Sequence, residues 1–342
     1  MKLEEVFSFK NMMTCAFKCI KGVGWKRSTQ NFEYHMMEYV YLVRKAVIAG
    51  VYKSKGFNKF SRQEHGKRRN IQAPHITERM LQKCFCDFCL LPIFQPTFIY
   101  DNGACLKKKG TSFAVKRTKQ MLHNYYVNHK SNEGYILQMD IKSFFESIDH
   151  KTLIEMVRNK VDEPLFKLYK YLVDCFDGDA GLGLGSQISQ VSASIYLNKL
   201  DHQIKDEMQI KYYSRHMDDS WIFAESKDQL RIYLKEIQET IRELKLKLND
   251  KKTQIRPLKD FKYLKRRFTL HENGKQTIKP HKPNILRAKR KHKKLTAAGN
   301  VEAAKNVDGS LTGYLKEFNY INKYTRRNYE VQVKTNNLKP SR

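Results

Sequence analysis

The sequence predicts an α+β fold in which helices alternate with short β hairpins. Three observations support this class. Runs such as "GYILQMDI" (134–141) and "YYSRHMDDSWIFA" (212–224) have the length and composition of strands. The Asn-Gly pair of "HENGKQ" (271–276) is typical of a hairpin turn. Between such runs, apolar residues recur at helical spacing over longer segments.

The N-terminal part is predicted to contain helices and one basic hairpin. The segment 51–75 has the alternation of a hairpin that turns at His65–Gly66 and ends at Pro74. Helical patterns continue to Phe94, and a lysine-rich loop covers 105–117. Before the hairpin, an amphipathic helix is predicted from apolar residues at helical spacing: Tyr34, Met37, Val40, Val43 and Val47.

The second half is predicted to alternate strands and helices. "GYILQMDI" is an apolar run that ends on a single acid, which is typical of a buried strand. A glycine-rich loop, "DGDAGLGLGS" (177–186), precedes the longest predicted helix. The helices predicted in this half are 149–161, 164–176, 187–208, one capped by Ser226, and a basic helical region from about Pro280.

The charge of the chain indicates a polyanionic partner. It carries 65 lysine and arginine residues against 35 acidic residues, a net charge of +30. Residues 251–342 hold 25 basic and 6 acidic residues, and therefore +19 of that total. Release of counterions makes such a surface bind nucleic acid. The composition therefore favours a nucleic-acid-binding protein over the alternative, a globular protein with a highly soluble surface.

We expect the protein to act in a reducing cytoplasm, without a membrane partner. The first residues lack the apolar segment of a signal peptide. No apolar run approaches the roughly 20 residues that a membrane span requires. The seven cysteines are scattered along the chain. Cys86 and Cys89 form a CxxC without a second pair, which favours packing in an apolar helix over a zinc site.

Three carboxylates form the candidate catalytic centre. Asp140 ends one predicted strand, and Asp218 and Asp219 occupy the turn of a later hairpin. If these strands are neighbours, the carboxylates converge and repel one another unless a cation lies between them. Two Mg²⁺ ions held in this way are the usual device for phosphoryl transfer. The alternative is three ordinary turn aspartates, which the placement of the pair between two strands disfavours.

At these positions the sequence resembles the reverse transcriptases. "HMDD" (216–219) stands where the family has YxDD, with His216 in place of the usual aromatic residue. "MDIKSFFESIDH" (139–150) is similar to the first catalytic motif. Four further segments resemble fingers, late palm, primer-grip and thumb motifs, in that order: "GKRRNIQAPHITERMLQ", "LNDKKT", "FKYLKRRF" and "SLTGYLKEFN". The likeness covers about residues 60 to 320.

The resemblance implies an RNA-directed DNA polymerase with a right-hand fold of fingers, palm and thumb. The palm would contain an antiparallel sheet and the thumb would be helical. The implied parts are an N-terminal helical extension (1–54), fingers (55–134 and 156–183), palm (135–155 and 184–278) and a basic helical thumb (279–342).

The resemblance also assigns roles to residues of the catalytic centre. Asp140, Asp218 and Asp219, helped by the Ile141 carbonyl, would hold two Mg²⁺ ions, for which Mn²⁺ could substitute. Lys252 would act as the acid that protonates pyrophosphate. The carboxylates and Lys252 together form the implied catalytic set.

Further residues would bind nucleotide and nucleic acid. Lys67 and Arg69 would contact the triphosphate, and Phe145 would exclude the 2′-hydroxyl, although it could instead be a core residue. The remaining implied positions are Leu184, Gly185, Ser189 and Gln190 at the nascent pair, Tyr263, Leu264 and Lys265 in the primer grip, and Arg287, Lys289, Arg290, Lys291, Lys293 and Lys294 on nucleic acid.

One departure from the family pattern is informative. The family usually has QGxxxSP before the long palm helix, whereas residues 184–190 read LGxxxSQ. This variant resembles the reverse transcriptases of diversity-generating retroelements, which copy a template repeat with errors mainly at adenines. The resemblance implies template RNA, RNA/DNA duplex and dNTPs as ligands, with a small basic accessory protein, oligomeric in some forms, as partner. The gene would be bacterial or phage-encoded.

Two alternatives stay open at this point. Leu184 could be a neutral change in another short bacterial lineage, such as a retron or phage-defence reverse transcriptase. The chain could also be a catalytically idle RNA-binding module like a splicing maturase. The three aspartates argue against the idle module, because a pure RNA binder has no reason to present clustered acids to a polyanion.

Overall fold

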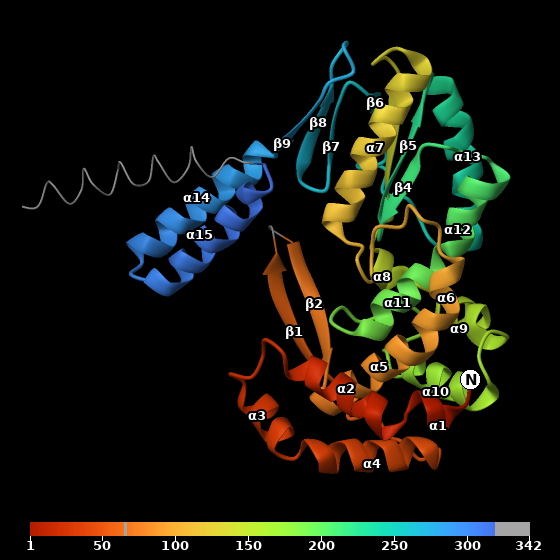
Figure 1. The fold of residues 1–342 in the computed structure, drawn as a ribbon, viewed down its shortest axis with the longest axis vertical. Helices are drawn as coiled ribbons and strands as arrows, with labels where there is room; N and C mark the ends of the chain where they lie inside the picture. The colour runs from red at the N-terminus through yellow and green to blue at the C-terminus, as the bar shows by residue number, and fades with distance from the viewer. Residues whose placement is uncertain (65–66, 319–342) are drawn as a thin grey trace, which may run out of the picture. The chain divides into compact units, whose positions relative to one another are not determined.

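A computed structural model describes residues 1–64 and 67–318 of the chain. They form two compact units, which are considered separately below (Figure 1). The first unit contains residues 1–117 and 137–255, and the second contains residues 118–136 and the chain from 256 onward. In the described ranges, every helix is too short or too polar to span a bilayer.

The first unit begins with a layer of short helices. Ser8 caps the second of them, and Met12, Cys15 and Cys19 bury its inner face against α5. The prediction of a single helix from Tyr34 onward is wrong. The helix is interrupted at His35, and the Tyr34 side chain is 86% exposed. The helices are α1 (Leu3–Val6), α2 (Phe9–Ile20), α3 (Arg27–Tyr34) and α4 (Met36–Ile48).

The predicted basic hairpin is present. Strands β1 (Phe57–Glu64) and β2 (Lys67–Pro74) pair in antiparallel register from Phe57 opposite Pro74 to Glu64 opposite Lys67. The predicted turn at 65–66 lies outside the described residues. Arg62 is directly opposite Arg69, and two like charges in such a pair destabilise a hairpin unless an anion lies nearby.

A helical segment follows the hairpin and fills the core of the first unit. Cys86 and Cys89 are fully buried in it, as the prediction of apolar helix packing requires. Residues 118–129 of the last of these helices belong to the second unit. The elements are α5 (Ile76–Phe85), the π-helical turn η1 (Cys86–Leu90), α6 (Leu91–Phe94), the 3₁₀ turn η2 (Gln95–Thr97) and α7 (Thr111–His129).

A four-stranded sheet carries the candidate site. Its strand order is β4-β5-β3-β6, and β4 and β5 form the hairpin predicted at 212–224. Strand β3 is buried on both faces, through the side chains of Ile136, Leu137 and Met139. This explains the continuous apolar run in its sequence. The strands are β3 (Tyr135–Asp140), β4 (Tyr213–His216), β5 (Asp219–Ala224) and β6 (Gln254–Pro257).

Helices accompany this sheet along the chain, and α13 packs on β5. The long helix predicted at 187–208 is three successive pieces, because the backbone departs from regular α geometry at Leu197 and again in a π-helical turn. The helices are α8 (Phe144–Ser147), α9 (His150–Arg158), α10 (Glu163–Asp174), α11 (Gln187–Tyr196), α12 (Asn198–His202), η3 (Gln203–Glu207) and α13 (Lys227–Glu243).

The second unit combines a three-stranded antiparallel sheet with a helical hairpin. Gly274 has a φ of +76° in the predicted Asn-Gly turn, where an added Cβ would lie 2.5 Å from the Tyr126 ring. The strands are β7 (Asp260–Tyr263), β8 (Arg266–Leu270) and β9 (Gln276–Pro280), and the helices are α14 (Lys282–Ala297) and α15 (Val301–Lys316). Residues 319–342 of the predicted thumb lie outside the described chain.

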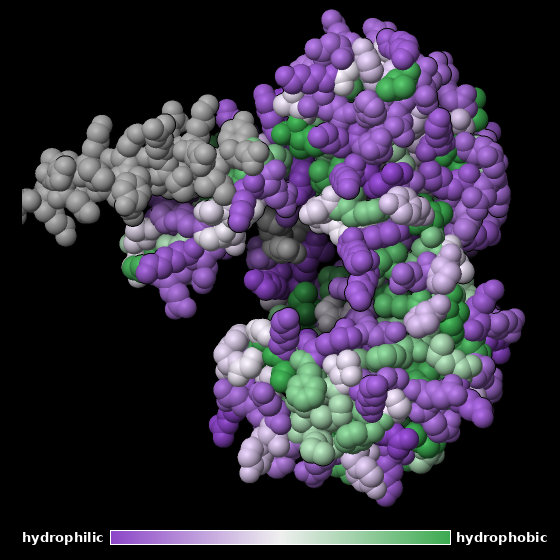
Figure 2. Space-filling model, in the orientation of Figure 1, coloured by the Kyte–Doolittle hydropathy of each residue, from purple (hydrophilic) through white to green (hydrophobic). Residues whose placement is uncertain are grey.

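The surface agrees with the charged composition. Figure 2 shows hydrophilic side chains over most of the visible face. Exposed large hydrophobic side chains include several in the N-terminal helical region: Phe17, Trp25, Tyr34, Met37, Tyr41 and Leu42.

Candidate active site

Asp140 is the last residue of β3 and is 5% exposed. Asn249 holds it from the loop after α13: its backbone N–H donates to the Asp140 carbonyl (2.8 Å) and its side-chain amide to Oδ2 (3.1 Å). The Lys252 ammonium pairs with Oδ1. The structure therefore places Lys252 in the site. It also adds Asn249, which the "LNDKKT" motif contained but which the sequence alone does not single out.

Asp218 and Asp219 lie at the tip of the β4–β5 hairpin. Asp219 begins β5 opposite His216, and β5 is the sheet neighbour of β3. Asp140 and Asp219 are close enough that the Asp140 carboxylate raises the pKa of Asp219. The strand order thus brings together carboxylates that are about 80 residues apart in sequence, as the sequence pattern predicts.

The electrostatics of the three carboxylates favour a cation. Burial, together with the charges of Asp218 and Asp140, raises the pKa of Asp219 to about 7. Burial also raises the pKa of Asp218, with Asp140 adding to it, while Lys252 and Arg69 act in the opposite direction. Ionised acids in this site are therefore costly until a positive charge compensates them.

The donor set fits Mg²⁺, which prefers carboxylate, carbonyl and water oxygens. Within the described ranges, no three His, Cys, Asp or Glu side chains are close enough to enclose a metal ion by themselves. Mg²⁺ commonly keeps several waters and takes ligands from substrate phosphates, so an incomplete protein cage is compatible with it. Ile141, whose carbonyl is the other predicted ligand, follows Asp140 directly and pairs with Leu248.

His216, which replaces the aromatic residue of the YxDD pattern, has a structural explanation. Its Nδ1–H donates to the Gly103 carbonyl at 2.9 Å. Burial lowers the pKa of His216, so the ring is neutral at physiological pH. A half-buried ring with one hydrogen bond to the backbone therefore stands beside the carboxylates.

The basic hairpin and the LGxxxSQ segment meet at one point of the first unit. The Gln72 backbone N–H donates to the Leu184 carbonyl at 3.0 Å, and Ile71 pairs with Leu184 in a parallel bridge. Gly185 has a φ of +114°, and an added Cβ would lie 3.3 Å from the Ile71 side chain. A glycine is therefore required here by conformation and by close packing. Arg69 precedes this contact on β2, and its charge acts on Asp218.

A buried polar network anchors the same loop, and the sequence did not predict it. The Ser186 hydroxyl donates to Gln82 Oε1 (2.5 Å), and the Gln82 amide donates to Glu78 (3.2 Å). Ser54, just before the hairpin, donates to the other oxygen of Glu78 at 2.5 Å. Glu78 and Gln82 are fully buried, and burial raises the pKa of Glu78. Glu78 and Gln82 are one helical turn apart on α5, and this spacing is the feature of the sequence that could have indicated their hydrogen bond.

Phe145 and Phe144 have different environments. Phe144 is buried (3% exposed) and belongs to the core, whereas Phe145 is of intermediate exposure, with the two ring centroids 5.5 Å apart. The Leu182 N–H donates to the Phe145 carbonyl at 2.7 Å, which ties Phe145 to the loop that carries Leu184. Of the other predicted residues of that segment, Ser189 is buried and Gln190 is exposed.

The predicted primer grip and thumb cluster belong to the second unit. Leu264 and Lys265 form the β7–β8 turn with φ of +46° and +64°, and the Tyr314 hydroxyl donates to the Lys265 carbonyl. Tyr263 ends β7 and is buried. The thumb cluster lies on α14, where no residue is buried, and all six of its side chains are exposed: Arg287, Lys289, Arg290, Lys291, Lys293 and Lys294.

Comparison with known proteins identifies a family and a similar curated protein. The family described as "Reverse transcriptase (RNA-dependent DNA polymerase)" matches residues 56–266. The retron Ec73 reverse transcriptase of Escherichia coli is 23% identical over 235 residues, covering 59% of this chain and 72% of that protein.

Among solved structures, the apo telomerase of Candida tropicalis, truncated from its C-terminal domain, is similar with a TM-score of 0.48 at 11% identity. That similarity covers 65% of this chain and 55% of the telomerase chain. The Candida albicans telomerase in complex with a fragment of telomeric RNA has a TM-score of 0.49 at 10% identity, covering 67% of this chain and 46% of the telomerase. The chain thus spans about half the length of these telomerase chains.

Proposed function

The chain belongs to the reverse transcriptase (RNA-dependent DNA polymerase) family, and we propose that it makes error-prone cDNA for a diversity-generating retroelement. Its helices and antiparallel sheets are those of the α+β right-hand polymerase class that the sequence predicts. The observation that carries the finer proposal is Leu184, at the position where the family usually has glutamine. RNA-directed DNA synthesis is the chemistry of the family, and the retroelement is the proposal.

In this proposal Asp140, Asp218 and Asp219 hold the catalytic Mg²⁺, with the Ile141 carbonyl as a further ligand. The bound metal supplies activation of the primer 3′-hydroxyl and neutralisation of triphosphate charge. Lys252, which forms an ion pair with Asp140, is proposed to give a proton to the departing pyrophosphate. Manganese could replace magnesium, because both accept oxygen ligands.

We assign the subdomains as the motifs imply. The N-terminal extension is 1–54, the fingers contain 55–134 and 156–183, the palm contains 135–155 and 184–278, and the thumb is 279–342. Lys67 and Arg69 on β2 bind the triphosphate, and Phe145 closes the space that a 2′-hydroxyl would occupy. The cluster on α14 binds the phosphate backbone of template and primer, with the β7–β8 turn as primer grip.

Leu184 is proposed to loosen discrimination at the nascent base pair. Its carbonyl is bound by β2, so its side chain occupies a defined position beside the hairpin. A glutamine there could hydrogen-bond near the minor groove of the pair, whereas leucine offers only apolar contact. Removing one such contact reduces discrimination by roughly 1–3 kcal/mol, about ten- to a hundredfold. Preference for errors at adenine follows from the family resemblance and not from this contact.

Sequencing of cDNA tests the proposal. The purified enzyme, with its element RNA and a small basic accessory protein, should misincorporate far more opposite adenine than opposite other bases. Leu184→Gln should lower this error rate, because it restores a polar contact. Leu184→Met is the matched control, since it keeps an apolar side chain of similar volume and should keep the parental errors. Low, base-independent error in the parent would remove the retroelement assignment.

The second candidate is a retron-type or phage-defence reverse transcriptase. The observation that favours it is the similarity to the retron Ec73 enzyme. The DNA that flanks the gene separates the two: a near-identical repeat pair within a neighbouring variable gene supports the retroelement. An idle, maturase-like module is disfavoured by the Asp140 carboxylate, which Asn249 and Lys252 hold beside the aspartate turn.

The proposed setting is the cytoplasm of a bacterium, with the gene on its chromosome or on a phage. The ligands are template RNA, the RNA/DNA duplex and dNTPs. The net charge of +30 supports binding to these polyanions.

A further inference from the structure

The turn that carries the two catalytic aspartates has an unfavourable backbone. His216 and Asp219 are paired, so Met217 and Asp218 alone connect β4 to β5. Met217 has a φ of +57°, in the left-handed region that residues with a Cβ seldom adopt. Such a conformation persists only when neighbouring groups hold it.

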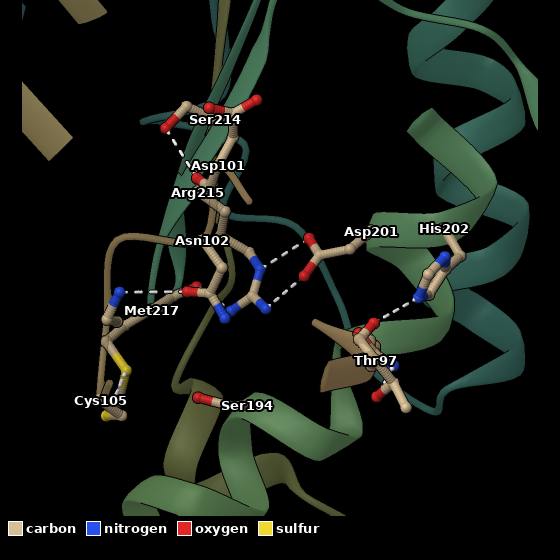
Figure 3. Close-up of polar contacts among 12 residues, drawn as sticks. Thr97, Asp101, Asn102, Cys105, Ser194, Asp201, His202, Ser214, Arg215 and Met217 are labelled. Carbon is tan, nitrogen blue, oxygen red and sulfur yellow. Dashed lines mark hydrogen bonds and ion pairs between the residues drawn. The ribbon is translucent and has the colours of Figure 1, made fainter. Parts of the chain in front are cut away.

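Arg215 supplies one of these groups from β4. Its Nη1–H donates to the Met217 carbonyl at 3.1 Å. The other side of the guanidinium forms a two-pronged ion pair with Asp201, with Nε–Oδ1 at 2.8 Å and Nη2–Oδ2 at 2.5 Å. Arg215 is 1% exposed and Asp201 is 0% exposed. Figure 3 shows the guanidinium between the Asp201 carboxylate and the turn.

Asp201 connects the turn to the other half of the site. It lies in α12, which continues directly from α11, and α11 begins at Gln187 just after the Leu184–Ser186 loop. The Tyr213 hydroxyl also donates to Asp201 Oδ1, at 2.7 Å. One helical segment and one ion pair therefore link the loop at the proposed nascent pair to the aspartate turn.

A second contact restrains the edge of β4 that faces away from β5. The Gly103 N–H donates to the Arg215 carbonyl (2.8 Å), and the Arg215 N–H donates to the Asp101 carbonyl (3.2 Å). The Gly103 carbonyl accepts the bond from His216 (Figure 3 shows the neighbouring Asp101–Asn102 segment). An added Cβ on Gly103 would lie 2.9 Å from the Ala114 Cβ, so this close approach depends on glycine.

We propose that the Arg215–Asp201 pair is a positioning device, which fixes the Met217–Asp218 turn and thereby sets where the Asp218 and Asp219 carboxylates can bind metal. The proposal rests on the proposed function, because it adds a positioning residue to that site. A buried ion pair is often no more stabilising than apolar residues of similar volume. The contribution of this pair is therefore the geometry of the turn, through the third hydrogen bond of the guanidinium.

Four variants test this role. Arg215→Lys keeps the charge but cannot serve Asp201 and the Met217 carbonyl together. The double variant Arg215→Met with Asp201→Leu removes both charges, so that neither is left buried alone. Tyr213→Phe removes only the other bond to Asp201 and serves as the matched control. Arg215→Gln supplies a neutral hydrogen-bond donor. It tests whether a bond to the Met217 carbonyl alone restores part of the kcat that Arg215→Lys loses, and a kcat no higher than that of Arg215→Lys would count against the role of this bond.

The measurements are kcat on an RNA template, the half-saturating Mg²⁺ concentration, and the rise in Tm that Mg²⁺ produces without substrate. Arg215→Lys and the double variant should lose about a hundredfold in kcat, as for a misplacement of about 1 Å. They should need several times more Mg²⁺ and show a smaller Mg²⁺-induced rise in Tm. Tyr213→Phe should match the parent in all three.

The outcomes separate the proposals. A double variant with parental kcat and Mg²⁺ dependence overturns the positioning role. If that variant does not fold, Arg215→Lys decides, and parental kcat and Mg²⁺ dependence there overturn the role equally. An inactive parent would instead count against the proposed function. In that case the Mg²⁺-induced rise in Tm still tests the positioning role, because it needs no RNA or dNTP.

Discussion

Asp219 shows how a single residue can trade stability for function. Its carboxylate is buried beside Asp218 and Asp140, and the repulsion among the three carboxylates destabilises the folded state. Asp219→Asn removes one charge and should abolish primer extension on RNA, at a cost on the order of several kcal/mol in the barrier. The same change should raise the Tm of the metal-free protein, because less repulsion remains. RNA binding, measured as the control, should stay near parental. Normal synthesis by this variant and by Asp218→Asn would contradict the site.

The pKa of Asp219 also predicts how stability depends on pH. Its value is about 7 in the folded protein against 3.8 for the ordinary carboxyl, so the folded state binds the proton more tightly. Its favourable contribution is therefore complete below about pH 4 and is lost as pH rises through 7. Mg²⁺ binds the ionised form, so it should raise the Tm more at pH 8 than at pH 5. Thermal unfolding with Mg²⁺ and with EDTA measures this, and equal shifts at both pH values would refute it.

Phe145 is predicted to select deoxynucleotides. Phe145→Ala should allow extension with rNTPs alone, because it opens space for the 2′-hydroxyl. Phe145→Tyr is the matched control, since it keeps the ring and should still exclude rNTPs. Primer extension with rNTPs measures the effect. If the alanine variant does not incorporate rNTPs, Phe145 is a core-packing residue, as Phe144 is.

At the scale of elements, α14 is the clearest candidate for backbone binding, because it exposes seven lysine and arginine side chains and buries none. Replacing Arg287, Arg290 and Lys294 with glutamine should weaken nucleic-acid binding regardless of sequence. The slope of log affinity against log salt should fall by about one for each lost contact. Changing the exposed lysines Lys167 and Lys235 to glutamine is the control. An unchanged slope in the α14 variant would make this face a solvated surface only.

The elements also show where sequence patterns succeed. The hairpin at 57–74 and strand β3 were predictable, because alternation and a short apolar run report burial directly. The break at His35 was not, because the apolar spacing continues across it. The division of 187–208 into three pieces was equally hidden, since a single π-helical turn is too short to show its period in the sequence.

At the scale of the whole molecule, charge and motif order were readable along the chain, and they led to the correct family. The division into two units was not readable, because each unit joins segments that are distant in sequence. The boundary runs through the helix at 111–129 and through two strands of the central sheet, where no change of composition marks it.

The sequence by itself determined the class of chemistry, because acids, glycines and aromatic residues at set spacings suit few reactions. Only the tertiary structure decided how these residues are held. Asn249 and Lys252 meet Asp140, Gln82 connects Glu78 to Ser186, and Arg215 joins Asp201 to the aspartate turn. The physical reason is that a buried polar group must find a partner in space, and that partner can lie anywhere along the chain.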